Sequence, residues 1–177
     1  MAVISSERLH LRELAVDDVG DTYVGWLNDP QVARFLETRW REQTEASVRA
    51  FVAAVNARSD EFLYGIFLNE NRRHIGNIKV GPIRAHHGVA DVSLLIGERD
   101  CWGKGFAAEA IAAVSRHAFA HLGVRKLAAG MYAPNEGSRR AFLKLGYKEE
   151  GRRRLHYMLD GEPCDLIELG ALPEDLA

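Results

Sequence analysis

Cysteine, net charge and long apolar runs are all scarce in this chain. Cys101 and Cys164 are the only cysteines among 177 residues, too few for a disulfide framework, which favours a reduced, cytoplasmic protein. No apolar run approaches the roughly 20 residues of a membrane span, and the first residues lack the long apolar region of a signal peptide. The net charge of -2 gives no general attraction to nucleic acid or to anionic lipid. We therefore expect neither nucleic acid nor a membrane as a partner.

The remaining composition is that of a folded domain. Apolar residues make up 47% and charged residues 27% of the chain, as in soluble globular proteins. A chain of 177 residues can bury a core of ordinary size, and it contains no repeat, linker or low-complexity segment. We expect a single domain over residues 1–177.

The most informative stretch runs from residue 90 to residue 123. Ala90 to Ile96 is a short apolar run, typical of a buried strand, and the glycine-containing segment 97–105 interrupts it. Apolar residues then recur at helical spacing, and Gly123 suits the C-terminal cap of that helix. The apolar face consists of Ala107, Ile111, Val114, Ala118 and Leu122.

A glycine loop that opens a helix can bind an anion, because the first backbone N–H groups of a helix lack partners inside it. A Walker-type loop does not fit. Five residues separate Gly97 from Gly103 where that motif has four, and Lys104 is followed by Gly105 instead of Ser or Thr. A dinucleotide fingerprint is matched by Gly103, Gly105 and Ala108, but the acidic residue expected about 20 positions later is missing.

Two motifs carry a resemblance to a known family. The loop W-G-K-G-F-A and the downstream segment N-E-G-S-R-R-A-F-L-K-L-G-Y-K-E-E-G resemble the GNAT acyltransferase superfamily, and most of all its RimJ/RimL-like branch. The resemblance extends over most of the chain. Asp100 stands where the family's loop has Gln or Arg, and because that loop binds mainly through backbone amides, the departure costs little.

The resemblance implies acetyl-CoA as the co-substrate. Its pyrophosphate is expected on the amides of residues 103–107, and its pantetheine in a gap between the central strand and the next parallel strand. The implied cofactor contacts are Leu94, Leu95, Ile96, Gly103, Lys104, Gly105, Phe106, Ala107, Asn135 and Ser138.

The other segments predict a mixed α/β sheet. Strands are expected over 7–14, 62–68, 74–80, 125–133 and 147–154, and Asp160-Gly161 indicates a hairpin between 155–159 and 164–169. Helices are expected over 18–27 with Asp17 as N-cap, over 31–37, from Thr44 onward and over 135–145. We expect the sheet to contain about six or seven strands, flanked by four or so helices. The resemblance implies the GNAT fold, in which the central parallel pair splays apart.

Two residues are candidates for proton transfer. Acetyl transfer requires a neutral amine and a protonated thiolate leaving group. The resemblance makes Asp91 the candidate base, acting through water, and Ser138 the candidate acid. Each has a structural alternative: a salt bridge for Asp91, and helix capping for Ser138 and Asn135. Many superfamily members use a tyrosine where this chain has Phe142, so that mechanism is excluded.

The resemblance also implies that the segment after the first strand forms one wall of the acceptor site. The candidates are Trp26, Phe35, Glu37, Arg39 and Trp40, whose aromatic members are equally compatible with a core role. His117 and His121 stand four residues apart on one helix, but neither a neighbouring Glu nor a third ligand is evident. We expect no metal.

Taken with the resemblance, these residues predict an acetyl-CoA-dependent N-acetyltransferase that works by direct transfer in a ternary complex. A small amine such as an amino sugar is the favoured acceptor. A protein N-terminus or a polyamine is the alternative. A function of another class, a non-catalytic acyl-CoA-binding module, is disfavoured by the presence of Asp91 and Ser138. Whether the protein forms a homodimer is left open.

Overall fold

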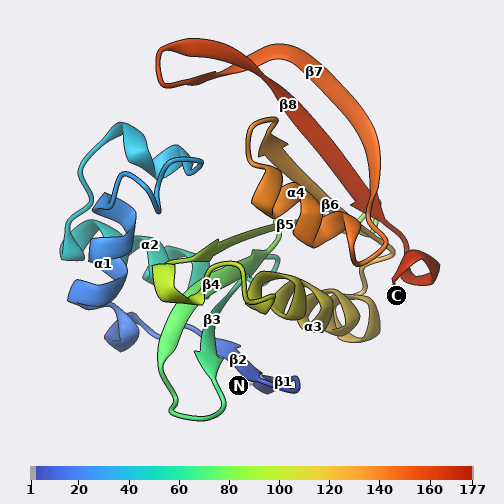
Figure 1. Ribbon diagram of the computed structural model, residues 1–177. Coiled ribbons are helices and arrows are strands. Elements are labelled where there is room, and N and C mark those ends of the chain that lie inside the picture. Colours follow the sequence, from blue (N-terminus) through green and yellow to red (C-terminus); the bar gives the residue numbers. More distant parts are fainter. Residues whose placement is uncertain (1–2, 177) are drawn as a thin grey trace.

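The sheet contains eight strands, and its edge strand β1 has no counterpart among the sequence-based expectations. The structure, a computed structural model, describes residues 3–176 (Figure 1). The strands are β1 (Val3–Ser5), β2 (Leu9–Glu13), β3 (Phe62–Leu68), β4 (His74–Val80), β5 (Val89–Ile96), β6 (Lys126–Tyr132), β7 (Lys148–Leu159) and β8 (Glu162–Ala171). The helices are α1 (Asp21–Asn28), α2 (Glu45–Asn56), α3 (Phe106–His121) and α4 (Glu136–Leu143), with 3₁₀ turns η1 (Val16–Asp18), η2 (Glu37–Trp40), η3 (Arg99–Cys101) and η4 (Pro173–Asp175).

The strand order is β1-β2-β3-β4-β5-β6-β8-β7, and β5 and β6 form the one parallel pair of the described sheet. This pair is joined over only three residue positions, from Val89↔Lys126 to Asp91↔Ala128. Beyond Asp91, β5 continues its pairing with β4 as far as Ile96, while β6 follows β8 as far as Tyr132. The mixed α/β fold with a splayed central pair is therefore confirmed.

Helices cover both faces of the sheet and divide the core in two. The larger core lies under α3 and α4 and includes Ile111 and Phe142, whereas the smaller one lies under α1 and α2 and includes Trp26 and Val52 (Figure 1). Successive side chains of a strand point to opposite faces. Since Leu95 packs against the smaller core, Asp91 and Ser93 share the α1–α2 face.

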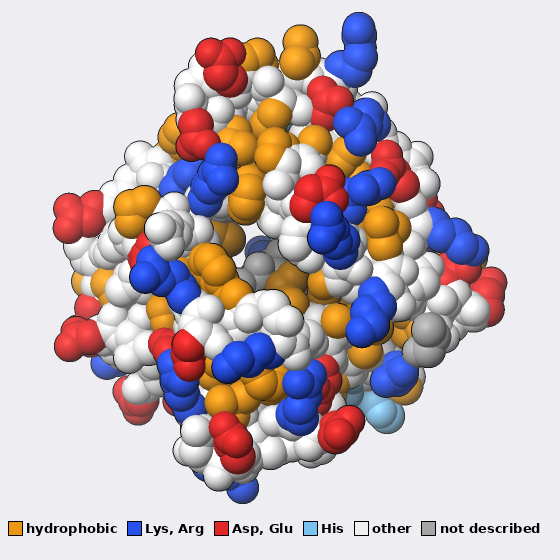
Figure 2. Space-filling view, viewed as in Figure 1, with side chains coloured by type: hydrophobic (Ala, Val, Ile, Leu, Met, Phe, Trp, Pro, Cys, Tyr) orange, Lys and Arg blue, Asp and Glu red, His pale blue; other side chains and the backbone are white. Residues whose placement is uncertain are grey.

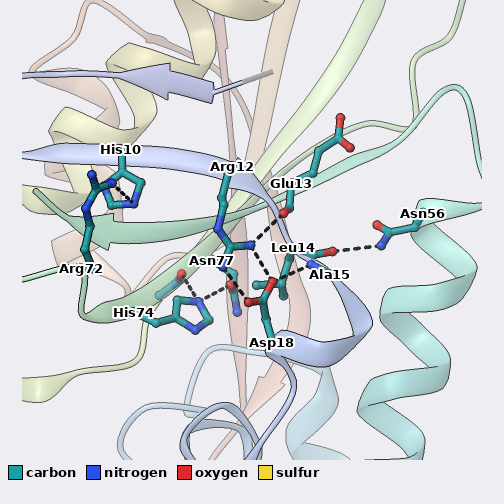
Figure 3. A network of polar contacts seen from close by, with 11 residues as sticks. His10, Arg12, Glu13, Leu14, Ala15, Asp18, Asn56, Arg72, His74 and Asn77 are labelled. Atoms are coloured by element: carbon teal, nitrogen blue, oxygen red, sulfur yellow. Dashed lines mark hydrogen bonds and ion pairs between the residues drawn. The ribbon is translucent and has the colours of Figure 1, made fainter. Parts of the chain in front are cut away.

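The chain before α1 follows a path that helix periodicity does not foresee. The helix expected over 18–27 begins at Asp21, after an N-cap at Gly20, and Asp17 lies inside η1. The cause is Asp18, whose carboxylate accepts hydrogen bonds from the Ala15 N–H and from both terminal nitrogens of Arg12, the latter at 2.6 Å (Figure 3). This bidentate pair holds the pKa of the Asp18 carboxyl below its ordinary value.

The same network continues into β4, where His74 and Asn77 lie 2.8 Å apart between Nε2 and Oδ1 (Figure 3). Burial lowers the pKa of His74, so its imidazole stays neutral at physiological pH. On the other side, Asn56 donates to the Leu14 carbonyl oxygen at 2.9 Å and thereby fixes α2 against β2 (Figure 3). These contacts hold the α1–α2 layer in place over the sheet.

No α-helix forms over 31–37. Asp29 caps the Gln31 and Val32 amides in a turn. Arg39 donates to the carbonyl oxygens of Arg34 and Leu36 and so holds the end of this segment in turns. Only η2 follows, so this segment is an irregular strap on the α1–α2 side.

Other local signals are confirmed. Thr44 and Ser47 form a reciprocal capping box at the start of α2. Gly123 follows α3 with a φ of +66°, as a C-terminal cap requires. Asp160 and Gly161 both have positive φ and join β7 to β8 in the expected hairpin.

Trp26 sets the direction in which the chain leaves β5. Its indole lies directly over Gly97, and a Cβ on that glycine would stand 1.9 Å from the ring. The indole Nε1 donates to Glu98 Oε1 at 2.9 Å. Gly97 is therefore required by the close approach of the ring, and α1 is packed onto the start of the glycine loop.

We predict that Gly97→Ala lowers the free energy of unfolding by about 1–3 kcal/mol, because the ring must move to admit a methyl group. Gly25→Ala is the matched control: it lies in α1 with open space around it and should stabilise by about 0.5–1 kcal/mol. Chemical denaturation measures both. A Gly97→Ala protein as stable as the parent would show that the indole contact does not constrain this position.

Candidate functional site

The gap between β5 and β6 is the central feature of the candidate site. Leu94, Leu95 and Ile96 border it on the β5 side and are all half-buried. Leu94 and Ile96 pack on the core under α3, and Leu95 on the core under α1 and α2. The three residues expected along the pantetheine thus lie where the register provides no partner strand on the β6 side.

The glycine loop leads from this gap into α3. Gly103 and Gly105 have φ of +72° and +83°, a backbone conformation that glycine adopts without strain. Gly105 is the N-cap and offers no side chain to the first amides of α3, which begins with Phe106 and Ala107. A Cβ on Gly103 would meet nothing within 4 Å, so the approach to the loop backbone is open there. Lys104 between them is exposed.

Ion pairs hold the loop at both ends. At the start, Arg73 binds Glu98 and contacts both Asp100 carboxylate oxygens at 2.8 Å, which holds the pKa of Asp100 below its ordinary value. At the end, Glu109 in the first turns of α3 accepts from the Arg8 N–H and Nε, both at 2.7 Å. The loop conformation is therefore fixed by the protein before any ligand binds.

Asp91 occupies the last paired position before the strands diverge. Its side chain is 48% exposed on the α1–α2 face, and Arg84 Nη2 stands 3.5 Å from Oδ1, at the limit of a hydrogen bond. The salt-bridge alternative is thus present but loose. The carboxylate remains accessible to water.

Asn135 and Ser138 open α4 on the opposite face of the sheet. Asn135 Oδ1 accepts from the Ser138 N–H at 3.3 Å, so the capping alternative is realised for Asn135. The Ser138 hydroxyl has no hydrogen-bond partner within residues 3–176 and is half-buried. Its proton is therefore available to a ligand.

The two candidates lie on opposite faces of the sheet beside the gap. β6 extends from Ala128, beside Asp91, to Tyr132, a distance of about 13 Å along the strand. α4 then returns toward Lys148, which is level with Ala128 through Gly170. Eight helical residues cover about 12 Å. Ser138 consequently lies on the cofactor-loop side of the gap, and Asp91 on the α1–α2 side.

Three aromatic rings and one carboxylate form a wall at the open end of β6. We call it the acceptor wall (Phe35, Glu37, Tyr132 and Tyr157). The Tyr132 and Tyr157 rings stack at a centroid distance of 4.3 Å, and Phe35 lies 6.0 Å from Tyr132. The Tyr132 hydroxyl donates to the Glu37 carboxylate. Burial raises the pKa of Tyr132 to about 12, so this phenol stays protonated in the physiological range.

Arg39 ties the acceptor wall to the hairpin. Its Nη2 donates to the Tyr132 hydroxyl at 3.0 Å and to the Met158 carbonyl oxygen at 2.8 Å, and its guanidinium lies 4.2 Å from the exposed Trp40 ring. Arg34 adds an ion pair with Asp160 at the hairpin turn. The β7–β8 hairpin therefore reaches across to the strap before α2 (Figure 1), and Figure 2 shows the hollow that remains between them.

Of the five expected acceptor residues, Phe35, Glu37, Arg39 and Trp40 are brought together, and Trp26 lies apart in the smaller core. Sequence reasoning missed Tyr132 and Tyr157. Tyr132 was assigned only to a strand, and the position of Tyr157 depends on a register shift in β7 that alternation does not reveal.

The remaining candidate residues lie on the helices. Phe142 is buried against Tyr147 in the larger core, away from any opening. The His117 and His121 rings are 4.9 Å apart, and within residues 3–176 no group of three or more His, Cys, Asp or Glu side chains could hold a metal ion. In the same part of the chain, each helix is too short or too polar to cross a membrane.

Comparison with known proteins identifies the family and supports the fold. The sequence model of the family described as Acetyltransferase (GNAT) domain matches residues 8–148. The uncharacterised N-acetyltransferase YoaA of Bacillus subtilis is 28% identical over 166 residues, covering 92% of this chain and 92% of that protein.

Two solved structures in complex with coenzyme A share the fold. Spermidine N-acetyltransferase of Vibrio cholerae, which also holds spermine, is 18% identical with a TM-score of 0.85, covering 96% of this chain and 98% of that one. RimL, a ribosomal α-N-protein acetyltransferase, is 16% identical with a TM-score of 0.86, covering 97% and 98%. The family model matches most of this chain, which shows that the chain belongs to the GNAT acetyltransferase family. It is an acetyl-CoA-dependent acyltransferase.

Proposed function

We propose that this enzyme transfers the acetyl group of acetyl-CoA directly to the primary amine of a small molecule, and that it belongs to the RimJ/RimL-like branch. The observation that carries the proposal is the distribution of the two proton-transfer candidates over the two faces of the gap. Asp91 lies on the α1–α2 face, where the acceptor wall stands, and Ser138 lies on the face of α3 and the glycine loop.

A thioester held in the gap is accessible from both faces. The amine approaches from the side of the acceptor wall, and water bound to Asp91 removes its proton. The thiolate departs on the other side, where the Ser138 hydroxyl donates a proton to sulfur. The nitrogen–carbon bond forms as the carbon–sulfur bond breaks, so no acyl-enzyme is required.

The cofactor fits the residues present. The amides at the start of α3 would bind the pyrophosphate, and the open space above Gly103 admits a phosphate oxygen. Leu94 to Ile96 would pair with the pantetheine amides as an added strand does.

A small acceptor is supported by the closure of the hairpin onto the strap. The Arg34–Asp160 pair and the Arg39 bond to Met158 join the hairpin to the strap over the acceptor wall, which favours an acceptor smaller than a folded protein surface. An amino sugar or a polyamine would enter this hollow, its apolar faces against the rings. A protein α-amine on a flexible N-terminus is the competing acceptor.

The test is a panel of amines scored by release of coenzyme A thiol: glucosamine, spermidine and a short peptide with a free α-amine. Turnover of glucosamine or spermidine above the peptide supports the small-molecule proposal. Preferred turnover of the peptide overturns it in favour of a protein N-terminus. Binding of CoA by calorimetry without thiol release for any amine indicates a non-catalytic acyl-CoA-binding module.

The cofactor site predicts a selective effect of Gly105→Val. A branched side chain at φ +83° is strained, and its Cβ would stand 3.4 Å from Nη2 of Arg8, whose Nη1 donates to the Lys104 carbonyl oxygen in the loop. We expect the Kd for CoA to rise at least tenfold by calorimetry. Gly123→Val is the control, because it imposes a similar backbone penalty at φ +66° at the far end of α3 and should leave the Kd unchanged. Equal Kd values for the two variants would place the cofactor elsewhere.

The proton-transfer roles predict distinct pH profiles. A weakly basic sugar amine, like an α-amine with a pKa of about 7.7 to 8.0, needs only a modest base, so Asp91→Asn should shift the rising limb of kcat/KM to higher pH as solvent takes over. Ser138→Ala should lower kcat at every pH. Arg84→Gln is the control for Asp91, since it breaks the ion pair and keeps the carboxylate. If the rising limb of kcat/KM moves no further in Asp91→Asn than in Arg84→Gln, Asp91 serves only as a salt-bridge residue.

The contacts of Tyr132 in the acceptor wall predict a change in the KM of the acceptor without a change in the pH profile. Tyr132→Phe removes the hydroxyl that joins Glu37 to Arg39, so the acceptor KM should rise several-fold while the KM for acetyl-CoA is kept. Because the pKa of Tyr132 is about 12, the phenol does not titrate near neutrality, and the pH limb should stay in place. A shifted limb in Tyr132→Phe would instead assign proton transfer to this phenol.

A further inference from the structure

The β7–β8 hairpin contains an irregularity next to the acceptor wall. Arg153 pairs with Leu166, and Tyr157 pairs with Cys164, so β7 advances four residues while β8 advances two. Two extra residues are therefore accommodated in β7, and Leu155 among them has a φ of +50°, an uncommon conformation for a residue with a branched side chain. Its side chain is exposed.

One carboxylate holds this bulge. Asp165, between the two paired β8 positions, accepts from the Leu155 N–H at Oδ1 (2.9 Å) and from Arg152 Nη1 at Oδ2 (3.0 Å). These donors hold the pKa of Asp165 below its ordinary value. The Asp165 carbonyl oxygen also accepts from the Ala133 N–H at 2.9 Å, immediately before Asn135 and α4.

The bulge decides which side chain faces Tyr132. If the ladder continued unbroken from the Arg153↔Leu166 pair, the residue opposite Cys164 would be Leu155, and Tyr157 would stand two positions, or about 7 Å, nearer the hairpin turn. With the bulge, Tyr157 reaches Cys164 and stacks on Tyr132. The register shift thus places an aromatic ring, in place of an aliphatic side chain, in the acceptor wall.

We infer that Asp165 is a positioning residue for the acceptor: its carboxylate fixes the two-residue bulge that sets Tyr157 against Tyr132 and so determines the shape of the acceptor wall. This inference rests on the proposed function for the role of the wall. The bulge itself is independent of it.

The first experiment follows amide hydrogen exchange over residues 153–159 in the full chain. Asp165→Ala should raise exchange in this segment at least tenfold, and Asp165→Asn, which keeps an oxygen for the Leu155 N–H, should raise it less. Glu150→Gln is the control, because it removes a β7 carboxylate paired with Lys126 of β6, away from the bulge. Unchanged exchange in Asp165→Ala overturns the inference.

The second experiment measures kinetics with glucosamine, spermidine and the peptide. Asp165→Ala should raise the KM of the acceptor that is turned over about tenfold, with the KM for acetyl-CoA within twofold of the parent and partial rescue in Asp165→Asn. Tyr157→Leu should have a similar effect alone and add little in the Asp165→Ala background, since both act through one ring.

Additive effects, or an equal rise in the KM for acetyl-CoA, would make Asp165 a residue of general stability and overturn the inference. If the parent enzyme turns over none of the three amines, the proposed acceptor class fails, and the hydrogen-exchange arm still decides whether Asp165 holds the bulge.

Discussion

The divergence of β5 and β6 is the constraint on which the other features depend. A parallel pair that ends after three positions leaves backbone N–H and C=O groups without strand partners. Such groups are costly when buried, so they must meet water or a ligand. The two cores, under α3–α4 and under α1–α2, support the diverging strands from opposite faces and keep the gap from closing. The gap is thus maintained by packing, and it is available to a ligand that carries amides of its own.

The glycine loop is the second rigid feature, and its rigidity comes from residues distant in sequence. Arg73 on the β3–β4 hairpin and Arg8 beside β2 anchor its two ends, and Trp26 covers Gly97. An anion-binding loop that is already ordered loses little conformational entropy on binding. The amides at the start of α3 therefore need no rearrangement to meet a phosphate.

Local signals predicted the parts of the fold that local chemistry determines. The strand, loop and helix from 90 to 121, the capping box at Thr44 and the Asp160-Gly161 hairpin were all readable, because each depends on residues within a few positions. The helix expected over 18–27 begins later because Asp18 binds Arg12, and the segment 31–37 follows turns held by Asp29 and Arg39, contacts that helix periodicity does not register.

The candidate site divides in the same way. The residues expected on the cofactor side come from motifs that are contiguous in sequence, and their role stays a prediction. The acceptor side was predicted only on one flank, from Phe35 to Trp40. Tyr132 and Tyr157 complete it through a stacking contact between strands that are not neighbours in the sheet, in a register set by a bulge. Alternation of side chains along one strand contains no information on either.

The strand order also has a consequence for synthesis of the chain. β8 is the last strand to leave the ribosome, yet it lies between β6 and β7 in the sheet. Until residue 171 has emerged, the outer edge of β6 has no partner and is exposed to pairing with other chains. The part from β1 to α3, complete by residue 121, is already available to fold at that stage. The final hairpin thus arrives on a sheet that has largely formed, and it both closes the edge of β6 and brings Tyr157 against Tyr132.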